Sequence, residues 1–334
     1  MKIQQGDGRA RFEGWYLKHQ CGDQVLALIP GIQSDREGRR SAFLQVITKD
    51  VSRYLTFPAS SYHANRKRFG LRIGENIFSS RGIRLSVDTP EVSLHGALRY
   101  GKFDPLHYDI MGPFELLPFL ECSHGVVSMS HSLYGTLTLN GEKFVFDSGK
   151  GYIESDSGHS FPRSYLWTQC SDFAGEDCSI LISAAEIPLG GLRFPGCICA
   201  IHRNRQEIRL ATYLGGRVTS CDRRSIVLRQ GSYCLRADLI ADAALPLQAP
   251  QLGGMTRIIR ESAACRVRYR LWENGHLAFD LLGRNAGFEF VGNGQALVSG
   301  RLYIPKNNWA EQSGRKKHER FFDRHGAAAQ HLRH

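Results

Sequence analysis

The 334-residue sequence lacks the long apolar runs and the short motifs that mark several common protein classes. Its longest apolar segments, such as the one that begins at Val25, are far shorter than the roughly 20 residues of a membrane-spanning helix. No apolar segment follows the first basic residues as in a signal peptide, so we expect a cytoplasmic protein. The GxGxxG, P-loop, GxSxG and HExxH patterns are also missing, which argues against nucleotide-binding enzymes, serine hydrolases and zinc proteases.

The nine cysteines include no CxxC pair, which argues against a disulfide framework and against a zinc ribbon. Cys122, His124 and His131 lie close in sequence, but their spacing matches no standard metal site. We therefore expect reduced cysteines in the core, structural histidines, no metal and no cofactor.

The sequence is basic, with a formal net charge of +11 and a pI near 9.3. Its arginines are dispersed: Arg266, Arg268 and Arg270 alternate with apolar residues, as on the solvent face of a half-buried strand. This pattern does not predict a nucleic-acid groove with interleaved aromatic residues. It leaves open a peripheral contact with an anionic membrane.

Short segments rich in β-branched and aromatic residues, separated by glycine, proline and asparagine, predict an all-β protein. Asn140-Gly141 and Asn274-Gly275 each lie between two apolar runs and predict β-hairpins. A polar break at 172–177 predicts two domains, 1–172 and 173–300, followed by a basic, loosely ordered tail at 301–334. The proline-rich segment 243–254 is expected to be a surface linker.

Segment 105–121 differs from its surroundings because it combines three prolines with large apolar residues, including Met111, Phe114 and Phe119. Apolar loops of this length are uncommon unless they cover something. The segment is therefore either a lid over a ligand pocket or a plug between two domains.

Reactive polar residues and aromatic rings are concentrated in the stretch 151–169. The period of two in a strand places Tyr152, Glu154 and Asp156 on one face. His159 and Phe161 follow on a turn, because Gly158 and Pro162 end the strand. The stretch is either a solvated hairpin or the edge of a site.

Acid chemistry on an apolar substrate suits this stretch. Two carboxyls at i and i+2 lie within about 7 Å, and a partly buried acid beside another retains its proton near neutral pH. Such an acid can protonate an alkene, and ring faces can stabilise the resulting carbocation. The rings expected nearby are those of Trp15, Tyr16, Tyr152, Tyr165 and Trp167.

Several segments resemble the tocopherol cyclase family. They are FEGWYLK from Phe12, FLECSHGVVSMSHSLYG, GYIESDSGHSFP, YLWTQ, IIRESAACRVRYRL and GRNAGFEFVG. The third segment differs from the family's GYIEKDWG run, since Ser155 replaces lysine and Ser157 replaces tryptophan. The resemblance implies two lipocalin-like antiparallel β-barrel domains side by side with a hydrophobic pocket. It also implies protonation of a prenyl double bond and trapping of the cation by a phenol oxygen.

On these grounds we expect a protein that binds a hydrophobic prenylated quinol or isoprenoid, with cyclisation or hydration of its alkene as the activity. The alternative is a lipocalin-like carrier without turnover. Asp156 is the expected proton donor, Glu154 its pKa-raising neighbour, and His159 or Tyr152 a proton relay. The expected ligand contacts are Trp15, Tyr16, Met111, Phe114, Phe119, Phe161, Tyr165, Trp167 and Gln169.

Overall fold

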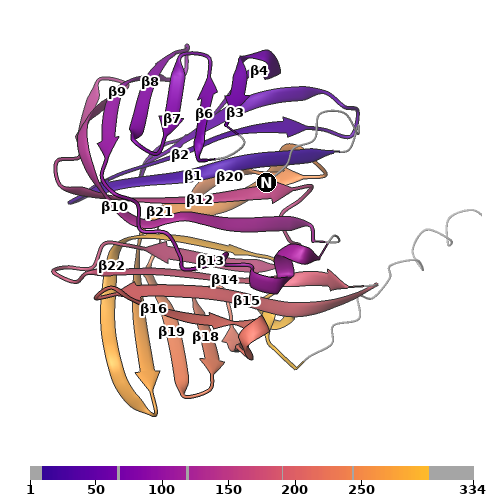
Figure 1. The fold of residues 1–334 in the computed structure, drawn as a ribbon. Coiled ribbons are helices and arrows are strands. Elements are labelled where there is room, and N and C mark those ends of the chain that lie inside the picture. The colour runs from indigo at the N-terminus through magenta and orange to yellow at the C-terminus, as the bar shows by residue number, and fades with distance from the viewer. Residues whose placement is uncertain (1–9, 66–67, 118–119, 190, 243, 301–334) are drawn as a thin grey trace, which may run out of the picture.

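The computed structural model describes residues 10–65, 68–117, 120–189, 191–242 and 244–300. These residues form two curved antiparallel sheets that stack face to face (Figure 1). The all-β prediction is confirmed, since only four short 3-10 turns interrupt the strands of the described chain. The predicted tail at 301–334 lies outside the described residues. No helix in the described ranges is long and apolar enough to span a membrane.

The first sheet contains twelve strands in the spatial order β4-β3-β2-β1-β12-β10-β9-β8-β7-β6-β5, with β11 paired to β10. Their bounds are β1 (Arg11–Cys21), β2 (Gln24–Ser34), β3 (Arg40–Ile47), β4 (Ser52–Pro58), β5 (Tyr62–Ala64), β6 (Gly70–Ile73), β7 (Asn76–Ser79), β8 (Gly82–Asp88), β9 (Ser93–Tyr100), β10 (Cys122–Leu139), β11 (Glu142–Val145) and β12 (Gly149–Gly158). The 3-10 turns η1 (Ala59–Ser61) and η2 (Gly112–Leu116) belong to this half of the chain.

The second sheet contains ten strands in the order β16-β15-β14-β13-β22-β21-β19-β18-β17, with β20 paired to β21. Their bounds are β13 (Tyr165–Cys170), β14 (Cys178–Leu189), β15 (Leu192–Arg203), β16 (Gln206–Ala211), β17 (Arg217–Cys221), β18 (Ser225–Gln230), β19 (Tyr233–Ala241), β20 (Leu245–Gln251), β21 (Gly254–Glu273) and β22 (His276–Val291). The turns η3 (Thr212–Leu214) and η4 (Gly294–Leu297) accompany it.

Both predicted hairpins are confirmed. Asn140 and Gly141 join β10 to β11 with φ values of 50° and 87°, and Asn274 and Gly275 join β21 to β22 with 51° and 79°. Two successive positive φ values are those of a type I′ turn, which asparagine and glycine adopt at low cost.

Each curved sheet has an apolar core of its own, and a third apolar layer joins the two sheets. Because strand side chains alternate, Leu17 and Ile153 enter the core of the first sheet, whereas their neighbours Tyr16 and Tyr152 enter the layer between the sheets. The hydrogen-bonded order of each sheet has an edge strand at both ends, so the pairing within the described residues does not close either sheet into a barrel.

The chain passes from the first sheet to the second between β12 and β13, before the polar break at 172–177. Strand β13 pairs with β14 and β22, although it precedes that break in sequence. The division into domains 1–172 and 173–300 stays a prediction.

The prediction of a surface linker at 243–254 is wrong from residue 245 onward. Residues 245–251 form edge strand β20, which tolerates proline because one side of an edge strand needs no hydrogen-bond donors, and a turn at 252–253 leads into β21. Leu247 and Ala249 are buried between the sheets, and the Gln45 side chain donates to the Gln248 carbonyl oxygen at 2.9 Å. The segment therefore fastens the second sheet to the first.

The burial of each leucine predicts how much it contributes to the free energy of unfolding. Leu235→Ala removes a fully buried side chain of the second core and should lower the free energy of unfolding by about 2–5 kcal/mol. Leu277→Ala, at a side chain that is 54% exposed, should change it by less than about 0.5 kcal/mol. Denaturant unfolding of both variants measures the difference, and equal effects would contradict this assignment of the core.

Candidate active site

The site is built on β12, which lies between β1 and β10 in the first sheet. Tyr152, Glu154 and Asp156 project from the face toward the second sheet, as the strand period predicts. Ile153 lies on the opposite face, in the core of the first sheet. Ser155 and Ser157 lie on the same face of β12 as Ile153. The two positions that differ from the family's GYIEKDWG sequence therefore point away from the carboxyls of Glu154 and Asp156.

Glu154 is 4% exposed, and all its hydrogen bonds and ion pairs to the described residues fall on one carboxyl oxygen, Oε2. The Tyr152 hydroxyl donates to Oε2 at 2.5 Å, and the Trp167 indole N–H donates to it at 3.1 Å. Trp167 comes from β13, so this second hydrogen bond joins the two sheets. Its ring fits there because Gly287 has no side chain: a Cβ atom at 287 would lie 2.6 Å from the ring.

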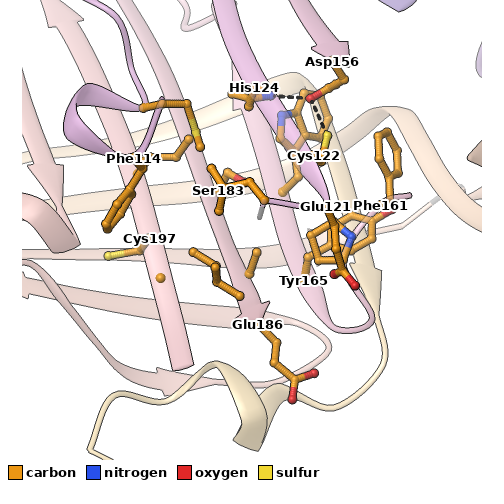
Figure 2. A pocket seen from close by; sticks show the side chains of 18 of the residues that line it. Phe114, Glu121, Cys122, His124, Asp156, Phe161, Tyr165, Ser183, Glu186 and Cys197 are labelled. Atoms are coloured by element: carbon orange, nitrogen blue, oxygen red, sulfur yellow. Dashed lines mark hydrogen bonds and ion pairs between the residues drawn. The ribbon is translucent and has the colours of Figure 1, made fainter. Parts of the chain in front are cut away.

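His124 completes the group from β10, where it is the register partner of Asp156. Its Nδ1 atom lies 2.9 Å from Asp156 Oδ1 (Figure 2). Its Nε2 atom lies 3.6 Å from Glu154 Oε2. The thiol of Cys122 also points to Asp156 Oδ1, at 3.6 Å. The imidazole therefore lies between the two carboxyls.

Burial raises the pKa of Glu154 to about 7, and the charge of His124 acts against this rise. For His124, burial alone would lower the pKa, but Asp156 and Glu154 outweigh it and raise the pKa to about 9. Near neutral pH the site thus holds a cationic imidazole beside a carboxyl that retains its proton in a large fraction of molecules.

A cavity of about 120 Å³ lies beside these groups, between the two sheets (Figure 2). Its polar lining includes His124, Glu154, Asp156 and, from β22 of the second sheet, Glu289. The remainder is mostly apolar and includes Met111, Phe114, Leu120, Phe161, Tyr165, Trp167, Ile187, Pro188 and Ile198. Part of the cavity wall therefore carries acidic side chains, and the rest is aromatic and aliphatic.

Segment 105–121 forms one side of this cavity through Met111 and Phe114. It is fastened to the second sheet by Arg209 of β16, whose guanidinium donates to the carbonyl oxygens of Tyr108 and Asp109 at 2.9 and 2.8 Å. Arg209 also forms an ion pair with Glu207 at 2.7 Å. The segment thus forms a wall of the cavity and is held to the second sheet by these polar contacts.

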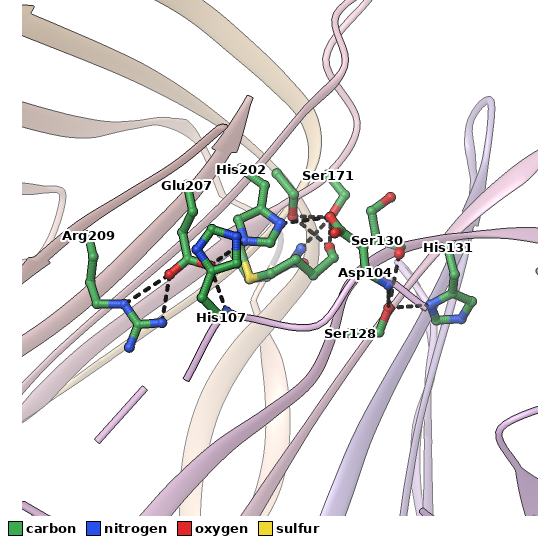
Figure 3. Close-up of polar contacts among 12 residues, drawn as sticks. Asp104, His107, Ser128, Ser130, His131, Ser171, His202, Glu207 and Arg209 are labelled. Carbon is green, nitrogen blue, oxygen red and sulfur yellow. Dashed lines mark hydrogen bonds and ion pairs between the residues drawn. The ribbon is translucent and has the colours of Figure 1, made fainter. Parts of the chain in front are cut away.

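A second histidine extends this anchor toward the first sheet (Figure 3). His202 Nδ1 lies 2.7 Å from Asp104 Oδ2, and its Nε2 lies 3.0 Å from Glu207 Oε2. Polar contacts therefore connect Asp104, in the segment that follows β9, through His202 and Glu207 to Arg209.

The structure does not bring every predicted site residue to the cavity. Trp15 packs near Phe69 in the core of the first sheet, and Gln169 donates to Ser171 at 2.7 Å between the sheets. His159 lies exposed on the turn after β12, and Phe119 lies outside the described residues.

Tyr16 is close to the cavity without lining it. Its ring packs edge-on against that of Trp167, with centroids 5.3 Å apart. The other predicted contacts, Met111, Phe114, Phe161, Tyr165 and Trp167, lie on the cavity wall.

Sequence reasoning missed His124, Glu261 and Glu289. His124 reaches the site through the antiparallel pairing of β10 with β12, which places it opposite Asp156. His131, which was grouped with it, instead packs against the rings of Tyr100 and Phe103. The two glutamates depend on a β21–β22 register that is shifted by bulges, which the sequence does not reveal.

His124, Glu154 and Asp156 each offer a ligand atom, and these atoms lie within 4.8 Å of one another. Among the described residues this is the one group of three or more such side chains with a spacing that suits a metal ion. Its members already contact one another, and the absence of a metal stays a prediction.

The fold and the site define an all-β protein with a buried acid cavity between two sheets. A model of the tocopherol cyclase-like family matches residues 91–292, more than half of the chain, and the chain belongs to that family. The family predicted from the sequence segments is thereby confirmed.

Individual relatives agree with this assignment. The chain is 25% identical over 222 residues to the chloroplastic tocopherol cyclase of Zea mays, covering 61% of this chain and 46% of that protein. It is 36% identical over 104 residues to the probable chloroplastic tocopherol cyclase of Oryza sativa subsp. japonica, covering 31% and 21%. The chain thus spans less than half the length of these relatives. The crystal structure of CghA shares the fold, with a TM-score of 0.54 at 10% identity over 85% of this chain and 89% of that one.

We predict that His124→Gln raises the pKa of Glu154 above 7, because the variant removes the charge that favours its carboxylate. The carboxyl stretching band in infrared titrations, identified by its loss in Glu154→Gln, measures this pKa. An unchanged pKa would show that the imidazole is not charged in the folded protein.

The same variant should alter the dependence of stability on pH. Because folding raises the pKa of His124 from 6.5 to about 9, its stabilising contribution is complete below pH 6.5 and is lost as the pH rises through 9. In the variant, the fall in unfolding free energy between pH 6.5 and 9 should be smaller than in the wild type. Denaturant unfolding at a series of pH values provides the measurement, and parallel curves would count against the prediction.

Arg209→Met should loosen the anchored segment, since it leaves two carbonyl oxygens and Glu207 without their donor. We expect faster proteolysis within 104–117 and faster release of a hydrophobic fluorescent probe. Arg229→Met, at an exposed arginine of β18, is the matched control and should change neither rate. Equal rates in the two variants would show that Arg209 does not hold the wall.

Proposed function

We propose that this protein is a tocopherol cyclase-like enzyme that protonates the alkene of a prenylated substrate in the cavity between its sheets. The cation then closes a ring with a hydroxyl oxygen or takes up water. The observation that carries this proposal is the buried carboxyl of Glu154, whose pKa is raised to about 7 at the wall of an apolar, ring-lined cavity. Acids that retain a proton near neutral pH suit general acid catalysis.

The arrangement around Glu154 favours loss of its proton at the moment of reaction. Because the three neighbouring groups all meet Oε2, Oε1 is available to carry the proton. When the proton passes to an alkene carbon, the π electrons form the new C–H bond and the carboxylate charge is left behind. Tyr152, Trp167 and the imidazolium of His124 stabilise that charge.

The wall of the cavity suits the carbocation. Trp167, Tyr165 and Phe161 supply ring faces, which attract cations. A dry cavity of about 150 Å³ accommodates a benzene molecule, so a cavity of about 120 Å³ suits one isoprene-sized unit. The rest of a prenyl chain would extend past Phe114, Ile187 and Pro188.

The contacts suggest a different division of roles between the two acids from the one expected from the sequence. Asp156 was expected to donate the proton, with Glu154 as its neighbour. In the structure Asp156 faces His124 Nδ1 at 2.9 Å, which suits a positioning residue that keeps the imidazole oriented and charged. Glu154 is the deeper group and carries the raised pKa. We therefore assign the donor role to Glu154.

Substitution of the two acids tests this function. With a panel of prenylated hydroquinones in deuterated water, the wild type should form a cyclised or hydrated product that carries deuterium at the former alkene carbon. Glu154→Gln removes the transferable proton and should lower turnover by about 10² or more at similar ligand affinity. Asp156→Asn should reduce turnover less and should lower the pKa of His124.

The outcomes separate an enzyme from a carrier. A carrier would bind these compounds unchanged, and both variants would alter affinity only slightly. A larger loss of turnover in Asp156→Asn than in Glu154→Gln would instead return the donor role to Asp156. Binding without product by the wild type across the panel would overturn the proposed function.

A further inference from the structure

A second pair of carboxyls lies on the other sheet, and one of the two lines the cavity. Glu289 of β22 lines the cavity, and Glu261 of β21 is its register partner across the ladder. Their exposed fractions are 9% and 1%. Glu289 is also the register partner of Trp167, whose indole reaches Glu154 on the first sheet. Carboxyls thus line the cavity on both sheets, with a tryptophan between them.

The surroundings of this pair are not those of a buried salt bridge. Glu289 Oε2 accepts a hydrogen bond from the Tyr165 hydroxyl at 2.8 Å. Neither oxygen of Glu261 makes a hydrogen bond of normal geometry to the described residues, and no lysine or arginine of the described chain forms an ion pair with either acid. Lys18, which is 1% exposed, acts on Glu261 electrostatically and favours its ionised form.

Stability does not account for such a pair. Burying a carboxyl costs free energy, and replacing buried polar groups by apolar residues of similar size is often neutral or stabilising. An apolar residue at 289 would continue the cavity wall, whereas a carboxyl there offers hydrogen bonds to a ligand. This placement is typical of a polar group that orients a ligand in an otherwise apolar pocket.

We propose that Glu289, supported by Glu261 and Tyr165, binds the hydroxyl group of the substrate and accepts its proton when the oxygen attacks the cation. The binding part needs only the cavity, whereas the proton-transfer part rests on the proposed function. A substrate that carries both a hydroxyl group and an alkene would therefore bind with its hydroxyl at Glu289 and its alkene at Glu154.

The protonation of the pair is consistent with this role. Burial first, and the neighbouring Glu261 second, raise the pKa of Glu289 well above its ordinary value. Burial also raises the pKa of Glu261, but Tyr16, Glu289 and Lys18 act against this rise. These effects favour a proton on Glu289 over one on Glu261, and the proposed transfer uses Glu261 as the ionised partner of the pair.

The proton transfer balances over one turnover. The O–H bond of the substrate breaks as its oxygen forms the C–O bond to the cation, and the released proton joins Glu289. The proton that Glu289 held moves to Glu261, beside Lys18. The pair then returns one proton to solvent, and Glu154 takes one up, so that ring closure is an isomerisation without net proton change. For water as the nucleophile the same steps add H₂O.

The test compares binding of a geranylated hydroquinone with binding of its dimethyl ether. Wild-type protein should bind the free hydroquinone about 10-fold or more tightly, since the ether cannot donate to Glu289. Glu289→Leu should reduce this ratio to about one. Glu142→Leu is the matched control, because Glu142 is an exposed glutamate of β11 in the first sheet and does not line the cavity. It should leave the ratio unchanged.

Thermal unfolding of each variant checks that it folds, and Glu289→Met, which also lacks a carboxyl acceptor, replaces Glu289→Leu if the leucine variant does not. A ratio that persists without Glu289, that vanishes in Glu142→Leu, or that is near one in the wild type would overturn the hydroxyl site. Full turnover by Glu289→Gln would overturn the proton-acceptor role. A wild type that discriminates between the two compounds but forms no product would overturn the proposed function and leave the hydroxyl site standing.

Discussion

The hydrogen bond from Trp167 to Glu154 is the contact on which the arrangement of the site depends. It connects β13 of the second sheet with β12 of the first, and it buries a carboxyl in the layer where the sheets meet. A carboxyl at this depth is tolerated because Tyr152 and His124 also face the same oxygen. The packing of the sheets and the chemistry of the site therefore have a common origin.

The balance of charge in the layer between the sheets explains why the site retains protons. The carboxyls of Glu154, Glu261 and Glu289 are almost fully buried there, and the basic groups that act on them include His124 and Lys18. Ionising all three acids would leave net negative charge in an apolar layer, which is costly. The raised pKa values of these three acids are thus linked, and a change in one of them alters the protonation of the others.

Much of the fold followed from local sequence, whereas the site followed only in part. The period of two placed Tyr152, Glu154 and Asp156 on one face, and the asparagine-glycine pairs marked two hairpins. His124 was misjudged because its role depends on pairing between distant strands, which local patterns do not encode. Strand β20 was misjudged because its prolines suggest a loop, and only its position at a sheet edge makes them compatible with a strand.

The distribution of the site over both halves of the chain has a physical consequence. Glu154 and His124 come from the first sheet, whereas Glu289 and Trp167 come from the second. The wall formed by Met111 belongs in sequence to the first half, yet Arg209 of the second half holds it in place. Neither half alone would therefore enclose the cavity or exclude water from its acids. Because exclusion of water is what raises the pKa of Glu154, the acid acquires its proton affinity only when the two sheets are packed together.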